Sequence, residues 1–108
     1  MVEYALSLDS VFSSLADPTR RDILQRVSKQ RMSVSEIAQP YDLSFAAISK
    51  HLKVLEKAKL IAKRRRGKEQ IVELSLSGLA EANQYLEAYR QMWEERFEAL
   101  DELLRKEV

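Results

Sequence analysis

Apolar residues recur along most of this chain at intervals of three and four, the spacing of an amphipathic α-helix. The first such segment spans 1–16 and is expected to form an N-terminal helix. Its apolar side is formed by Leu6, Leu8, Val11, Phe12 and Leu15. Few residues interrupt the helical pattern, because the 108-residue chain has only two glycines and two prolines. The pattern therefore predicts a mainly α fold.

Two further helix starts follow. Asp17 is a favourable N-cap residue, and Pro18 stands at the first helical position, where proline loses no hydrogen bond. The run from Ser33 to Glu36 has the capping-box pattern and predicts a short helix that begins at Ser33 and ends at Pro40. The helix that starts at Pro18 is expected to bury Ile23, Leu24 and Val27.

The next helix starts at Ser44, another N-cap residue, and has two different faces. One face is expected to be buried, since Ile48, Leu52 and Leu55 fall at i, i+4 and i+7. The opposite face is formed by Phe45, Ala46, Ser49, Lys50 and Lys53. It is small near its start, hydroxylated in its middle and cationic at its end, as a helix that enters a DNA major groove requires. An ordinary surface helix with solvated lysines is the alternative.

Residues 17–58 are expected to form a helix-turn-helix core.

The periodicity changes to that of short β-strands in residues 59–75. Two β-prone runs flank Gly67, which supplies the positive φ of a tight hairpin turn. The basic side chains of this hairpin are Lys63, Arg64, Arg65, Arg66 and Lys68. A hairpin behind a helix-turn-helix is a wing, and its tip is expected to contact DNA phosphates. The alternative is an edge hairpin whose charges only prevent aggregation.

The segment 76–108 contains no helix breaker after Gly78 and is expected to form one long helix. Such a helix spans roughly 40 Å, whereas a compact domain of this size is about 35 Å across. Its apolar side therefore lacks cover within one chain, and a homodimer is expected. Residues expected at the dimer interface are Leu8, Phe12, Leu86, Tyr89, Trp93, Phe97, Leu100 and Leu103. Alternatively, the aromatic members of this side could line a pocket for a small-molecule inducer.

Charge is distributed unevenly along the chain, although the net charge is only +1. Residues 44–68 contain nine basic residues and one acid, a balance of +8. From Glu81 onward there are eight acids and four bases, a balance of −4. A polyanion is expected to meet the middle of the chain and to be repelled by its end.

Several function classes lose support from the composition. With no cysteine, the chain has no disulfide, thiolate metal site or cysteine nucleophile. Neither a His–carboxylate constellation nor a glycine-rich phosphate loop is present, so an enzyme is not expected. No apolar run is long enough to cross a membrane, and a cytoplasmic protein is expected by default.

Three motifs in order, together with the last helix, carry a resemblance to a known family. The motifs are the runs 16–24, 35–38 and 44–55, and the last helix has the pattern Tyr-Leu-x-x-Tyr-x-x-Met-Trp-x-x-Arg over 85–96. The chain resembles the metal-free branch of the ArsR/SmtB winged-helix repressors. The resemblance implies a winged helix-turn-helix with a long C-terminal dimerisation helix. It also implies a transcriptional repressor that binds a double-stranded DNA operator as a homodimer.

The resemblance assigns roles to individual residues. The wing arginines would face phosphates or the minor groove. Independently of the resemblance, Lys53 on the exposed face and His51, as a packing or phosphate-contacting residue, complete the predicted DNA-binding set of this helix. Residues that would face bases are Ser44, Phe45, Ala46, Ser49 and Lys50.

Two departures from the family pattern affect what is expected. Ser33 and Ser35 stand where metal-sensing relatives have a Cys-x-Cys pair, and His51 is the only histidine, so neither a metal nor a cofactor is expected. Lys59 stands where the family usually has glycine. If the backbone there is left-handed, lysine costs about 1 kcal/mol relative to glycine.

Two alternatives stay open: a winged-helix protein-interaction module, and an RNA-binding module without operator recognition. The operator, the regulated genes and the identity of an inducer do not follow from the sequence.

Overall fold

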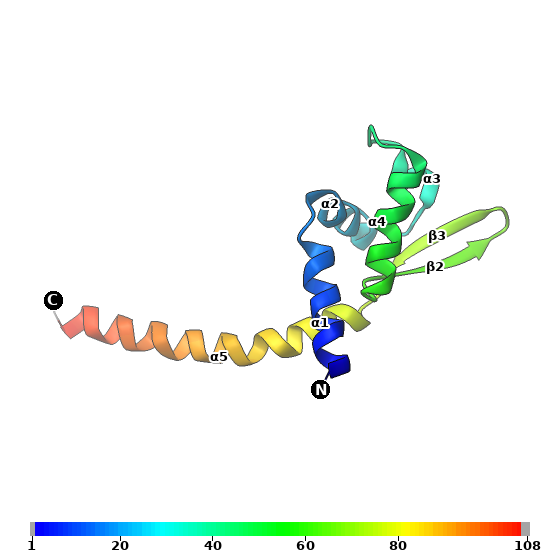
Figure 1. Ribbon diagram of the computed structural model, residues 1–108. Coiled ribbons are helices and arrows are strands. Elements are labelled where there is room, and N and C mark those ends of the chain that lie inside the picture. Colours follow the sequence, from blue (N-terminus) through cyan, green and yellow to red (C-terminus); the bar gives the residue numbers. More distant parts are fainter. Residues whose placement is uncertain (1, 107–108) are drawn as a thin grey trace.

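The computed structural model describes residues 2–106, with side chains from Leu8 onward, so the expected position of the Leu6 side chain lies outside the described residues. The elements form a head of short helices and a hairpin, from which one long helix projects (Figure 1). In chain order they are α1 (Val2–Leu15), α2 (Pro18–Lys29), β1 (Met32–Ser33), α3 (Val34–Ala38), α4 (Phe45–Lys57), β2 (Ile61–Arg66), β3 (Glu69–Leu74) and α5 (Ser77–Lys106).

The predicted caps are confirmed. The Asp17 side chain accepts a hydrogen bond from the Arg20 backbone N–H at the start of α2. At the start of α3 both hydrogen bonds of the capping box with Ser33 are present, so the helix proper begins one residue after that cap. Ser44 accepts from the Ala47 N–H at the start of α4. Each cap satisfies amides that have no partner within the helix, and this is why the helices begin at these residues.

The predicted hairpin is present, but it belongs to a three-stranded antiparallel sheet in the order β1-β3-β2. Gly67 has φ +64° at the tip, as the turn requires. Strand β1 was not predicted, because its two residues carry no pattern of their own. It forms only where Met32 lies opposite Val72 and Ser33 opposite Ile71.

One hydrophobic core lies between the first four helices and the base of the hairpin. The predicted buried face of α4 is confirmed, with Ile48, Leu52 and Leu55 at most 1 % exposed. Other members of this core are Val11, Ile23, Val27, Ile37, Ala58, Leu60, Ile61, Val72 and Ala82. The core holds α4 rigidly by one face and leaves the opposite face to solvent.

Helix α4 ends in a Schellman motif, and the last turn of this motif contacts the start of α5. The Leu60 N–H donates to the Leu55 carbonyl and the Lys59 N–H to the Glu56 carbonyl, each at 3.0 Å. Lys59 has φ +59°, so the left-handed backbone considered from the sequence is present at a non-glycine residue. The Lys59 carbonyl then accepts from the Gly78 N–H at 2.9 Å. A Cβ at Gly78 would lie 2.3 Å from the Ala58 carbonyl oxygen, so only glycine permits this close approach.

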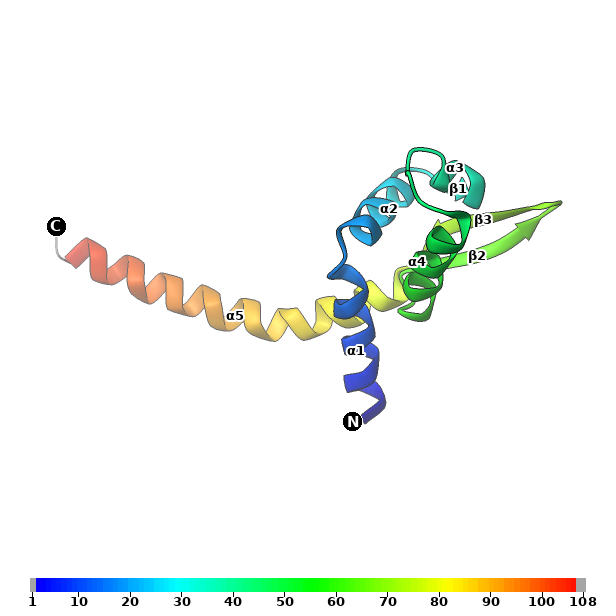
Figure 2. The ribbon, with the colours of Figure 1, turned by 45° about the horizontal axis from the view of Figure 1, so that its top comes forward.

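Helix α5 has 30 residues and extends well beyond the head (Figure 2). The radius of gyration is 18.7 Å, against about 13 Å for a compact chain of this length. Of its residues only Gly78 and Ala82 are buried, and both lie in its first two turns against the head. The expectation that the far turns lack cover within one chain is confirmed.

Candidate nucleic-acid interface

The solvent-facing side of α4 presents four of the five side chains that the sequence predicts for base contact, and the fifth, Ser44, is the N-cap immediately before the helix. Phe45, Ala46 and Lys50 are exposed, as is Lys53 one turn further on, whereas Ser49 is half-buried. Because the core fixes the opposite face of the helix, these side chains occupy defined positions. The helix therefore presents an apolar ring, a hydroxyl and two cations in order along one rigid face.

His51 points inward rather than toward this face. Its Nδ1 lies 3.3 Å from Arg20 Nη1 and 3.9 Å from Asp17 Oδ2, and its side chain is 21 % exposed. A guanidinium nitrogen can only donate, so Nδ1 accepts in this arrangement. The Arg20 backbone N–H, which donates to the Asp17 carboxylate, lowers the pKa of that carboxyl group. His51 thus packs against the start of α2, while its expected contact with DNA stays a prediction.

The two faces of the wing differ in how their cations are paired. Arg64 Nε forms a 2.6 Å ion pair with Glu73 Oε1, on the face away from α4. Lys63 lies on the α4 side, with Nζ 3.8 Å from Glu56 Oε1 and its side chain only 16 % exposed. Since side chains alternate along a strand, Arg65 lies on the same face as Lys63. Its Nε donates to the Gly67 carbonyl at the exposed tip, so its charge is not matched by a carboxylate there.

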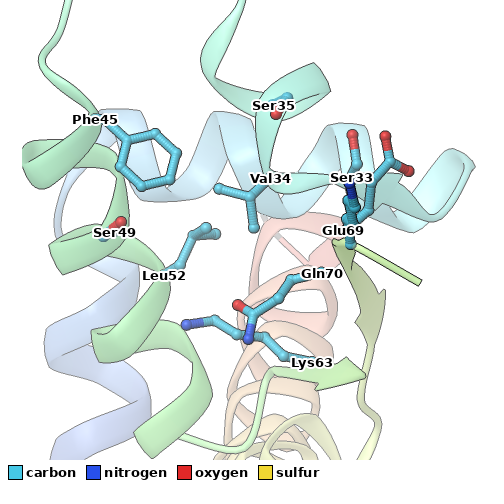
Figure 3. A pocket seen from close by; sticks show the side chains of 10 residues that line it. Ser33, Val34, Ser35, Phe45, Ser49, Leu52, Lys63, Glu69 and Gln70 are labelled. Atoms are coloured by element: carbon cyan, nitrogen blue, oxygen red, sulfur yellow. The ribbon is translucent and has the colours of Figure 1, made fainter. Parts of the chain in front are cut away.

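A hollow of about 300 Å³ separates α4 from the wing (Figure 3). Phe45 and Ser49 of α4 border one side, and Lys63 and Gln70 of the wing border the other. Val34 and Leu52 form an apolar part of the wall. Two predicted residues of α4, Phe45 and Ser49, and two predicted cations of the wing, Lys63 and Lys68, therefore border a single concave surface.

Two arginines that position these elements were missed by the sequence analysis. Arg20 Nε donates to the Ser14 carbonyl at 2.7 Å and Nη2 to the Ser13 carbonyl at 3.1 Å, and its third nitrogen reaches His51. Arg26 Nη1 donates to the Ile37 carbonyl at 2.9 Å and so holds the end of α3. No local signal could reveal them, because each arginine caps carbonyl groups of another helix.

The residues predicted at a dimer interface lie on α1 and α5. Leu8 is already buried within its own chain at 7 % exposure, so it has little surface left to offer a partner. The Phe12 ring contacts that of Tyr85 edge-on at 6.0 Å between centroids. The others are at least 45 % exposed and follow one side of α5: Leu86, Tyr89, Trp93, Phe97, Leu100 and Leu103.

Comparisons with known proteins agree with this geometry. A family model described as a helix-turn-helix domain matches residues 15–64. The chain is 39 % identical over 74 residues to the HTH-type transcriptional regulator Rv2034 of Mycobacterium tuberculosis, a match that covers 68 % of this chain and 69 % of that protein. It is also 36 % identical over 70 residues to the transcriptional repressor SdpR of Bacillus subtilis, covering 65 % and 76 % respectively.

A solved ArsR-like transcriptional regulator from Rhodococcus sp. RHA1 superposes with a TM-score of 0.74 at 30 % identity, over 95 % of this chain and 96 % of that one. The chain belongs to the ArsR family of winged helix-turn-helix transcriptional regulators. A homodimeric winged helix-turn-helix DNA-binding domain from Mycobacterium bovis, described as a possible ArsR-family regulator, shares the fold with a TM-score of 0.65 at 22 % identity, over 87 % of this chain and 83 % of that one. ArsR-family members regulate transcription and are not enzymes.

The structure of residues 2–106 bears on two other partners considered from the sequence, a membrane and a metal ion. None of the helices in this part of the chain is long and apolar enough to cross a membrane. Among the same residues, no group of three or more histidine and carboxylate side chains is placed to hold a metal ion.

Proposed function

We propose that this ArsR-family regulator is a repressor that binds a palindromic double-stranded DNA operator as a homodimer. The observation that carries the proposal is that Phe45 and Ser49 of α4 border the same hollow as Lys63 and Lys68 of the wing (Figure 3). A rigid helix beside a cationic hairpin suits a duplex, with the helix in the major groove and the hairpin along the backbone. The relative SdpR, a named repressor, supports the repressor assignment.

The dimer is proposed from the open apolar side of α5. Trp93, Phe97 and Leu100 are each more than half exposed, and nothing among the described residues covers them. A second copy would supply an equivalent apolar surface around a two-fold axis. The dimer would present two α4 helices, so a palindromic operator is expected. The M. bovis neighbour with this fold is homodimeric, which supports the same arrangement.

The helix and the wing are proposed to have different roles. Ser49 and Lys50 stand on a helix that the core fixes, so they can meet particular base edges. Arg65 stands at the tip of the hairpin, on the side of the hollow, and is proposed to neutralise a phosphate. Arg64 is paired with Glu73 on the other side, so it is proposed to contribute less.

Fluorescence anisotropy with an operator selected from a random duplex pool, and with a scrambled duplex, tests these roles over a salt series. Arg65→Ala should weaken both complexes by similar factors and reduce the salt slope by about two units per dimer. Lys50→Ala should instead reduce the difference in binding free energy between the operator and the scrambled duplex, by about 1–3 kcal/mol for each base that the side chain contacts. Arg64→Ala is the matched control and should change the slope less than Arg65→Ala.

If Arg65→Ala affected only the operator while Lys50→Ala weakened both duplexes equally, the two roles would be reversed. If the protein preferred no duplex sequence at any salt concentration, the protein-interaction or RNA-binding alternative would replace operator recognition.

Location in the cytoplasm and independence from metal ions stay part of the proposal. An unidentified small-molecule inducer is compatible with it, and no feature of the described residues identifies one.

A further inference from the structure

Phe45 is a large apolar side chain beside the polar and cationic side chains of the exposed face of α4. It is the first residue of α4, and its side chain is 65 % exposed. Most other exposed large apolar side chains lie on α5, where the proposed second copy would cover them. Helix α4 begins at the end opposite its junction with α5 (Figure 1), and Phe45 is its first residue, so the same dimer would leave the ring uncovered. Its ring is therefore accessible to a partner other than the second copy.

The position of this ring is well defined. Ser44 caps the helix immediately before it, and Ile48, one turn later, is completely buried in the core. The ring lies at the rim of the hollow, directed toward Val34 and above Ser49 (Figure 3). A phenylalanine has only two side-chain torsions, so little conformational entropy is lost when the ring contacts a ligand.

The surroundings of the ring restrict what can cover it. Ser49 and Lys50 follow on the same exposed face, and Lys63 and Lys68 border the hollow from the wing. A surface of this charge favours DNA over an apolar protein segment. In the major groove, the C5-methyl group of thymine is the apolar substituent that unmodified bases present, and a phenylalanine ring can contact it.

We propose that Phe45 selects a thymine in each operator half-site through contact between its ring and the C5-methyl group. The inference rests on the proposed function and adds a base preference to it. The contact is apolar and reads the methyl group, not the hydrogen-bonding edge of the base. Ser49 and Lys50, one turn further along the helix, would read neighbouring positions by hydrogen bonds.

The test replaces each thymine of the selected operator in turn with uracil, which removes only the methyl group. At one position, which recurs symmetrically in the two half-sites, uracil in a single half-site should lower the affinity about fourfold, the effect of losing one buried methyl group. Uracil in both half-sites removes two methyl groups and should lower the affinity about 15-fold. An operator with cytosine at that position should bind weakly. Replacing this cytosine with 5-methylcytosine should raise the affinity again, by about fourfold per half-site. Uracil at the remaining thymines should change affinity less.

The variant Phe45→Ala should bind thymine and uracil operators equally, at or below the affinity of the wild type for uracil. Leu43→Ala removes a neighbouring exposed apolar side chain, 44 % exposed, and should retain the thymine preference as a matched control. Circular dichroism of both variants checks that the helices remain.

The outcomes distinguish this inference from the proposed function. An operator without thymine in its half-sites, equal binding of thymine and uracil at every position, or a preference that persists in Phe45→Ala would overturn the role of Phe45 alone. A protein that prefers no duplex sequence would overturn the proposed function and this inference together.

Discussion

Helices α4 and α5 are both amphipathic, yet only α4 has its apolar side covered within the chain. In α4 the three residues of the apolar stripe are at most 1 % exposed. In α5 the apolar stripe from Leu86 to Leu104 is roughly half exposed throughout. Hydrophobic periodicity thus identifies the side of a helix that must be buried, but it does not say whether the same chain or another buries it.

The two helices meet at one small contact. Lys59 and Gly78 join the end of α4 to the first turn of α5 through a 2.9 Å hydrogen bond. A side chain at Gly78 would force the two helices apart. The position of α4 relative to a dimer formed through α5 would therefore depend on this contact.

Replacement of Leu52 by alanine should have the largest effect on the stability of the head. Leu52 is 1 % exposed in the core, so Leu52→Ala should lower the free energy of unfolding by about 2–5 kcal/mol. Urea denaturation followed by circular dichroism at one protein concentration measures this change. A decrease below about 1 kcal/mol would show that the core does not hold α4 as tightly as its burial indicates.

Replacement of Leu100 by aspartate should separate assembly from folding. Leu100→Asp puts a charge into the proposed apolar interface, so the dimer dissociation constant should rise at least about 100-fold, or about 2.7 kcal/mol. Light scattering at micromolar concentration should show the mass of two chains for the wild type and of one chain for the variant.

Glu95→Gln, a substitution on the exposed opposite side of α5, is the control and should leave the dimer intact. A wild type that is monomeric under these conditions would contradict the proposed dimer, and so would a Leu100→Asp variant that remains dimeric.

Replacement of Lys59 by glycine should give the smallest effect, and a stabilising one. Because φ is +59°, Lys59→Gly should raise the free energy of unfolding by about 1 kcal/mol. Lys57→Gly, two residues earlier within α4, should instead lower it by about 0.5–1 kcal/mol. Thermal unfolding of both variants checks the signs. Equal destabilisation by the two substitutions would mean that the left-handed backbone at Lys59 carries no strain.

Most of the fold could be predicted because its signals are local. The N-caps at Asp17, Ser33 and Ser44 act on amides within three residues, so short sequence patterns reveal them. Gly67 marks the hairpin turn for the same reason. The candidate DNA-binding surface could also be predicted in outline, since its side chains follow one helix face and one hairpin.

Long-range contacts decided what the sequence pattern could not. Strand β1 exists only because β3 pairs with it, and the residue that contacts the His51 ring is Arg20, 31 positions away. The pairing of Arg64 with Glu73 makes the wing arginines unequal, although the sequence presents them as one run.

The sequence by itself determined where the helices begin, which face of each is apolar and where the positive charge is concentrated, because these depend on neighbours along the chain. Only the tertiary structure decided which apolar face is covered and which cation is paired. It also decided that Gly78 must be glycine, because close approach of separate segments sets all three.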